Sequence, residues 1–328
     1  MGAKLDLGLA VLNGLVGDHL VRTRNGLAIE LGLVHGDAPL ALTRARLADA
    51  IPAPTPDVVV LVHGLMCTET IFRFPDGADY GSMLARDFGV TPLRVRYNSG
   101  RPIADNGAAL SALLEGLVDA YPVPIASISL IGFSMGGLVT RAACHTSSLA
   151  GCGHLAKLRR AFYVGTPHRG APLERGGRVL ASVLRKIPDP YTRLAADLID
   201  LRSDGVRDLG DADLRHEDRD VTRARARFSL RDPRHPIPLL DGIEHFLVAG
   251  NLSADPRLAL WFGDALVPVP SATFDHCSDA ASIALPPDHV RVFPGFAHVR
   301  LAHDPQVYEV LRGWWAGPSA ETAARSAT

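Results

Sequence analysis

The stretch that most constrains the fold is a short apolar segment that runs into a serine between two glycines. Residues 128–131 are mostly apolar, residues 132–136 read Gly-Phe-Ser-Met-Gly, and residues 138–143 continue at helical spacing. The pattern G-x-S-x-G between a strand and a helix is typical of a sharp turn that projects the serine hydroxyl outward. Glycines flank the serine because the backbone approaches too closely there for a Cβ atom. An ordinary strand–helix turn can show the same pattern, so the rest of the chain has to decide.

Length and composition describe a globular protein with a substantial core. The chain has 328 residues, of which 47% are apolar and 21% charged, enough for one large α/β domain or two small ones. The formal net charge of -1 gives no reason to expect nucleic acid as a partner.

Four cysteines are scattered without regular spacing: Cys67, Cys144, Cys152 and Cys277. Disulfide scaffolds are small and rich in cysteine, so we expect reduced thiols in a cytoplasmic protein. A Cys144–Cys152 pair is the alternative if the protein is exported. His145 beside Cys144 and His276 beside Cys277 lack a complete four-ligand spacing, and neither a metal nor a nucleotide cofactor is expected.

No stretch of the sequence reaches the roughly 18–20 apolar residues that span a bilayer. The apolar run at residues 7–16 is broken by Gly8, Asn13 and Gly14 and is followed by no cleavage site, so no signal peptide is expected. This run has helical spacing. We expect it to pack on the domain, with peripheral contact to a lipid surface as the alternative.

Apolar runs alternate with helical patterns along the chain. Strands are expected at residues 58–62, 91–97, 128–131, 160–165, 244–250 and 290–293, and helices near 81–88, 105–120, 138–143, 190–201 and 306–315. This alternation predicts a mostly parallel sheet with helices on both faces.

The chain reads as one domain with two additions. Residues 1–50 form an N-terminal extension with an extended piece near 27–33, and residues 171–240 form a cap-like insertion. Within that insertion, residues 202–234 are dense in arginine and aspartate and are expected to form a solvated excursion.

A serine hydroxyl is a poor nucleophile and needs a base, usually a histidine held by a carboxylate. On this kind of turn the order along the chain is serine, acid, histidine. Asp264 is the preferred acid, because glycine precedes it and apolar residues follow that could bury it beside a histidine. A turn-capping aspartate is the alternative reading, and the competing acids are Asp241, Asp255 and Asp275.

The preferred base is His298, which lies on a glycine-containing loop between the last strand and the last helix. His303 is the nearest rival, but it falls next to Asp304 and Pro305, which are typical of a helix start. His289, before the last strand, is a weaker rival.

Two backbone N–H groups must stabilise the oxyanion. One is expected from Met135, the residue after the serine. The other is expected from Leu65, in the loop after the strand at 58–62, where Gly64 permits close approach. His63 precedes Ser134 in the chain, which does not fit the order serine, acid, histidine. We therefore expect His63 to fix the loop after the strand at 58–62 rather than to act as the base.

Together these blocks resemble the α/β-hydrolase superfamily. Residues 165–170 (Gly-Thr-Pro-His-Arg-Gly), 263–268 (Gly-Asp-Ala-Leu-Val-Pro) and 295–298 (Gly-Phe-Ala-His) look like blocks of its lipase/esterase branch, including the group akin to inositol-deacylase lipases. The resemblance covers about residues 57–315. It implies an α/β-hydrolase fold with Ser134, Asp264 and His298 as the triad, and it places His168 as a structural residue that lines the site.

The sequence therefore predicts a hydrolase of carboxylic esters, with a small-molecule or lipid ester as substrate. A thioester, amide or polyester would use the same machinery, and a non-catalytic scaffold on the same fold is a third reading.

Overall fold

The computed structural model describes residues 3–35, 38–170, 203–217, 237–252, 264, 266–273 and 285–317. The helix expected at 190–201, much of the 171–240 insertion and the tail after residue 317 lie outside these ranges. Within them, no helix has the combination of length and apolarity needed to cross a bilayer. Cys67, Cys144 and Cys152 are free thiols, as expected, and Cys277 lies outside the described residues.

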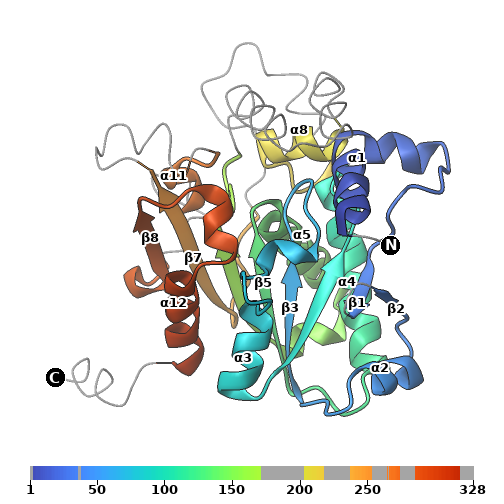
Figure 1. Ribbon diagram of the computed structural model, residues 1–328, viewed down its shortest axis with the longest axis vertical. Helices are drawn as coiled ribbons and strands as arrows, with labels where there is room; N and C mark the ends of the chain where they lie inside the picture. Colours follow the sequence, from blue (N-terminus) through green and yellow to red (C-terminus); the bar gives the residue numbers. More distant parts are fainter. Residues whose placement is uncertain are drawn as a thin grey trace.

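An eight-stranded sheet lies at the centre of the structure, in the order β2-β1-β4-β3-β5-β6-β7-β8 (Figure 1). Its strands are β1 (Gly32–His35), β2 (Ala38–Leu40), β3 (Asp57–Val62), β4 (Thr91–Arg96), β5 (Ser127–Phe133), β6 (Leu158–Val164), β7 (Glu244–Asn251) and β8 (Val290–Pro294). All strands from β4 to β8 in this order are parallel, and β1 is antiparallel to both of its neighbours. The parallel strands end at one edge of the sheet, where such folds place their ligand sites.

Helices cover both faces of the sheet. They are α1 (Ala3–Arg22), α2 (Arg44–Ala50), α3 (Tyr80–Phe88), α4 (Ile103–Ala120), α5 (Met135–Ala150), α8 (Asp204–Asp211), α11 (Val269–Ala272) and α12 (Pro305–Ala316), with short 3₁₀ turns η1 (Glu69–Phe72), η2 (Gly153–Lys157), η3 (Pro287–His289) and η4 (His298–Ala302). Helices α2, α4 and α5 share one buried core with the sheet, and α3 and α12 share another.

Strand β3 shows why the sheet must lie between two layers. Val58, Val60 and Val62 belong to the core of α4 and α5, whereas Val59 and Leu61 belong to the core of α3 and α12. An uninterrupted apolar run suits a strand that is covered on both faces. The predicted α/β fold with a mostly parallel sheet is confirmed.

Only the end of the extended piece expected at residues 27–33 forms a strand. The strand begins only at Gly32, because the side chain of Asn13 in α1 satisfies the backbone before it. Asn13 Oδ1 accepts a hydrogen bond from the Ile29 N–H at 2.9 Å, and Asn13 Nδ2 donates to the Leu27 carbonyl at 2.8 Å. These two backbone groups therefore do not pair with a neighbouring strand.

The charged stretch at 202–234 is not solvated throughout, which corrects the sequence expectation. Helix α8 forms inside it, begins at the N-cap Ser203 and buries Leu209 and Asp208. The Asp208 carboxylate accepts a hydrogen bond from the Ile103 N–H at 2.9 Å, at the start of α4. Three buried apolar residues, Leu209, Ala212 and Leu214, together with the helix cap, dock this part of the insertion on the core.

Helices α4 and α5 pack closely through small residues. A Cβ atom added to Gly107 of α4 would stand 2.5 Å from the Cβ of Ala142 and 2.8 Å from its carbonyl carbon. Glycine at this position therefore sets the distance between the two helices. In contrast, a Cβ at the exposed Gly313 of α12 would meet no atom within 4 Å.

We expect Gly107→Ala to lower the free energy of unfolding by about 1–3 kcal/mol, because backbone must move to admit the methyl group. Gly313→Ala is the matched change in an open helical position and should raise it by about 0.5–1 kcal/mol, since alanine has the higher helix propensity. Urea unfolding of both variants measures the difference. Equal effects of the same sign would contradict the packing argument.

Candidate active site

Ser134 occupies a strained turn between β5 and α5. Its backbone has φ 53° and ψ -124°, a conformation that costs a non-glycine residue on the order of 1–3 kcal/mol. The surrounding structure fixes it, because the Ser134 N–H donates to the Val164 carbonyl at 2.8 Å. A Cβ at Gly132 would stand 2.6 Å from the Cα of Gly137, so the turn closes only with glycine there. The turn expected from the sequence is therefore present.

Asp264 and His298 form a buried pair. His298 Nδ1 lies 2.7 Å from Asp264 Oδ2, and the two residues are 6% and 1% exposed. The other carboxylate oxygen, Asp264 Oδ1, accepts hydrogen bonds from the N–H groups of Leu266 at 3.1 Å and Val267 at 2.9 Å. One oxygen therefore caps a turn, as the alternative reading expected, and the other contacts His298, which is the geometry that the preferred reading requires. The burial of this carboxylate is thus compensated by hydrogen bonds.

Two glycines allow the loops that carry Asp264 and His298 to lie close to the sheet, and the sequence analysis did not identify either glycine as functional. A Cβ at Gly250, at the end of β7, would stand 2.9 Å from the Cβ of Asp264. A Cβ at Gly165, which has φ 61°, would stand 3.1 Å from His298 Cε1. The signal for Gly165 was its place in the Gly-Thr-Pro-His-Arg-Gly block.

The His298 ring also contacts the residue before the serine. Its centroid lies 5.0 Å from that of the Phe133 ring, so His298 lies beside the turn that carries Ser134. No hydrogen bond joins Ser134 and His298 among the described residues, and such bonds are often long before substrate binds.

The two expected oxyanion donors lie on segments that touch. Met135 is the first residue of α5, where N–H groups lack partners within the helix and the helix dipole is positive. Gly64, which precedes Leu65, lies against the serine, because a Cβ there would stand 3.1 Å from that of Ser134. A Cβ at Gly136 would stand 2.2 Å from the Val62 carbonyl oxygen, so α5 begins directly on the end of β3.

His63 is fixed in the loop and fully buried. Its Nδ1 lies 2.8 Å from the Gly64 carbonyl, its Nε2 accepts a hydrogen bond from the Tyr97 N–H at 3.3 Å, and its ring stacks on Tyr97 at 4.3 Å. Burial lowers the pKa of His63 to about 4. The neutral ring therefore holds the carbonyl of Gly64, in agreement with the role expected from the sequence.

His168 is also buried, and its backbone connects two loops of the site. Its N–H donates to the Ser271 carbonyl at 3.0 Å, and Ser271 Oγ donates to the Gly170 carbonyl at 2.8 Å. Burial and the nearby Arg141 guanidinium hold the pKa of His168 well below its usual value. The block at 165–170 thus ties the end of β6 to α11, which follows the Asp264 loop.

The rival residues make other contacts. His303 Nδ1 lies 3.0 Å from the Ile71 carbonyl oxygen, and His289 packs on Phe246 with its Nδ1 3.0 Å from the His245 carbonyl oxygen. Asp241 is exposed, and Asp255 and Asp275 lie outside the described residues.

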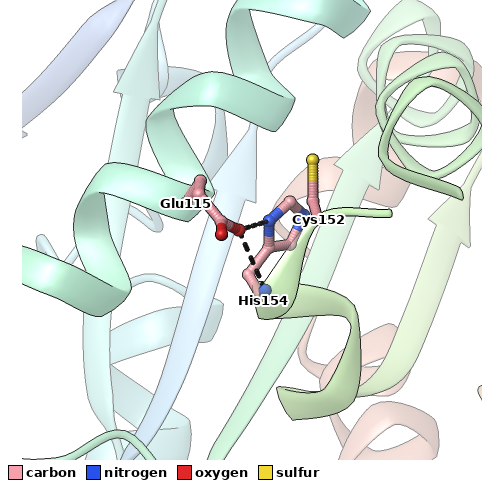
Figure 2. A group of neighbouring side chains, drawn as sticks. All are labelled: Glu115, Cys152 and His154. Carbon is pink, nitrogen blue, oxygen red and sulfur yellow. Dashed lines mark hydrogen bonds and ion pairs between the residues drawn. The ribbon is translucent and has the colours of Figure 1, made fainter. Parts of the chain in front are cut away.

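A second polar group, away from this site, has donor types that suit a metal ion. Ligand atoms of Glu115, Cys152 and His154 lie within 4.8 Å of one another, between α4 and η2 (Figure 2). Thiolate, imidazole and carboxylate are the ligands that zinc prefers. The sequence analysis missed this group, because Glu115 is far from the other two residues in the chain.

Hydrogen bonds already occupy these atoms. His154 Nδ1 lies 2.7 Å from Glu115 Oε2, and Nε2 lies 3.0 Å from Ser147 Oγ. The Ser147 hydroxyl also lies 2.7 Å from the Ala143 carbonyl oxygen and 2.7 Å from Ser111 Oγ, and Glu115 Oε2 accepts a hydrogen bond from the His154 backbone N–H at 2.9 Å. We interpret the group as a structural link between α4, α5 and η2.

The order of strands and the Ser134 turn define an α/β-hydrolase fold. No family model and no curated protein matches the chain in sequence. Among solved structures, the Bacillus licheniformis lipase BlEst2 in its propeptide form is similar over 81% of this chain and 52% of its own, at 18% identity and a TM-score of 0.51.

The mature form of the same lipase gives 18% identity over 79% of this chain and 92% of its own, with a TM-score of 0.49. A Pyrococcus furiosus esterase gives 17% identity over 79% of this chain and 80% of its own, with a TM-score of 0.44. Of these matches, the propeptide form, at a TM-score of 0.51 and 18% identity, shows the fold alone.

The buried His63 makes acid stability testable. Its folded pKa of about 4 lies below the ordinary 6.5, so its neutral form favours folding above pH 6.5 and the contribution is lost as pH falls toward 4. The free energy of unfolding should therefore fall when the pH is lowered from 7.5 to 5. We expect this fall to be about 2 kcal/mol smaller in His63→Asn than in the wild type. Urea unfolding at both pH values measures this, with the exposed His19→Asn as control. Parallel losses in all three proteins would contradict the assignment.

Proposed function

We propose that this protein is a serine hydrolase that cleaves carboxylic esters through an acyl intermediate on Ser134. The observation that carries the proposal is the buried Asp264–His298 pair, with Nδ1 and Oδ2 2.7 Å apart, beside a serine on a left-handed turn. The name of the structural neighbour from Bacillus licheniformis, a lipase, agrees with this reaction class.

Acylation follows from the geometry of these groups. Asp264 accepts a hydrogen bond from the Nδ1–H of neutral His298, which leaves Nε2 without a proton and able to take the proton of the Ser134 hydroxyl. Ser134 Oγ bonds to the ester carbonyl carbon, and the carbonyl oxygen becomes an oxyanion that the N–H groups of Leu65 and Met135 stabilise. The C–O bond to the alcohol then breaks, and the alcohol leaves with the proton that His298 returns.

Deacylation repeats the sequence with water as the nucleophile. His298 takes a proton from water, the hydroxide oxygen bonds to the acyl carbon, and Ser134 Oγ leaves with the proton from His298. The products are a carboxylic acid and the free enzyme. No metal or other cofactor enters these steps.

Exchange of any triad residue should abolish turnover of a p-nitrophenyl ester. We expect Ser134→Ala and His298→Ala to lower kcat about 10⁵–10⁶-fold, and Asp264→Asn about 10⁴-fold, because the amide would hold His298 in the wrong tautomer. Initial rates across acyl-chain lengths provide the measurement and also report the preferred acyl group.

Matched controls separate the triad from general damage to the fold. His303→Gln removes the rival histidine and Ser148→Ala removes an exposed serine of α5, and both should keep near wild-type kcat. A fluorophosphonate probe should label the wild type at Ser134 and leave Ser134→Ala unlabelled. Full activity of Ser134→Ala would overturn the proposal. Faster turnover of a thioester or amide than of any ester would revise the substrate class alone.

A further inference from the structure

Helix α1 lies directly on the loop that carries Leu65. A Cβ atom at Gly14 of α1 would stand 2.3 Å from Met66 Cγ and 3.2 Å from Met66 Cα, so the helix backbone touches the loop. Val11 and Leu15 of the same helix form a small buried cluster with Met66, and Leu65 packs against it. In Figure 1, α1 lies beside α8, beyond the carboxyl end of β3.

The loop is also held from its other sides. Met66 has φ 57°, a left-handed conformation that is uncommon without glycine, and its N–H donates to Ser99 Oγ at 3.0 Å. Below it, Gly64 lies against Ser134. The Leu65–Met66 segment is therefore enclosed between α1, Ser99 and the serine turn.

Helix α1 is itself fixed in place by polar contacts. Asn98 Nδ2 donates to the Gly17 carbonyl at 3.0 Å, and Ser203 Oγ donates to the Gly14 carbonyl at 2.6 Å. A Cβ at Gly100 would stand 2.0 Å from the Asn13 carbonyl oxygen, so the chain at 98–100 also touches the helix backbone. The helix thus has little freedom to move relative to the loop.

We propose that α1 is a positioning element of the active site, which acts through the contact of Gly14 with Met66 and holds the Leu65 N–H toward the carbonyl that Ser134 attacks. This inference rests on the proposed function. Oxyanion donors are effective because they are fixed before the charge develops, and a loop of strained backbone needs an outside contact to stay fixed. Gly14 is then a positioning residue, which acts on the site through Met66.

The test is Gly14→Ala, whose methyl group would push Met66 and turn the Leu65 amide. We expect kcat for a p-nitrophenyl ester to fall about 10–100-fold, with KM changed less than about twofold. This loss is smaller than that caused by complete removal of an oxyanion hydrogen-bond donor, because the Leu65 N–H would only be displaced. The affinity for a trifluoromethyl ketone, whose adduct with serine carries the oxyanion, should fall by the same factor. Gly8→Ala in the same helix is the control, because its Cβ would meet no atom within 4 Å, and its kcat should equal that of the wild type.

Ser99→Ala tests the same loop without adding volume, and it decides the matter if Gly14→Ala fails to fold. It removes the acceptor of the Met66 N–H and should lower kcat and ketone affinity together, about 5–50-fold. Wild-type kcat in both folded variants, or in Ser99→Ala alone where Gly14→Ala does not fold, would overturn this inference and leave the proposed function standing. If the wild type shows no ester turnover that is lost in Ser134→Ala, both the proposed function and this inference are overturned.

Discussion

The contact of the first turn of α5 with the ends of β3 and β6 is the constraint on which the rest of the site depends. Gly136 stands against the Val62 carbonyl, Gly137 would place a Cβ 1.9 Å from Thr166 Oγ1, and the Ser134 N–H is bonded to Val164. These close contacts hold the backbone of Ser134 in its strained conformation. The strain at Ser134 is compensated by the two-sided core, because the strands on either side of it are buried on both faces.

The sequence predicted the parts of the fold that depend on local pattern. Residues 58–62 and 160–165 are buried runs, and their strands formed where the apolar pattern placed them. The loops of Asp264 and His298 were found from their order in the chain, and the structure brings the two side chains into contact. Whether they perform the chemistry stays a prediction, since contact alone does not measure a rate.

What the sequence could not predict depends on contacts between distant residues. Asn13 takes the backbone of residues 27–29 out of the sheet, although their pattern alternates as a strand would. Gly250 looks like the end of an ordinary strand until the Asp264 loop is packed upon it. From the sequence, Gly14 is only a residue of low helix propensity, yet it is where α1 contacts Met66. Pattern reports which face of an element is apolar, and it does not report which element that face will meet.

The network at Glu115, His154 and Ser147 has a consequence for how active sites are recognised. By side-chain type and distance it is a second serine–histidine–acid arrangement, and its serine lies 3.0 Å from its histidine. Ser147 is fully buried, however, and its hydroxyl lies 2.7 Å from both the Ala143 carbonyl of its own helix and Ser111 Oγ. Among the described residues, a search by triad distances alone would therefore select this buried trio. What distinguishes Ser134 is the backbone that surrounds it: a turn with a positive φ, and a helix that begins at the next residue.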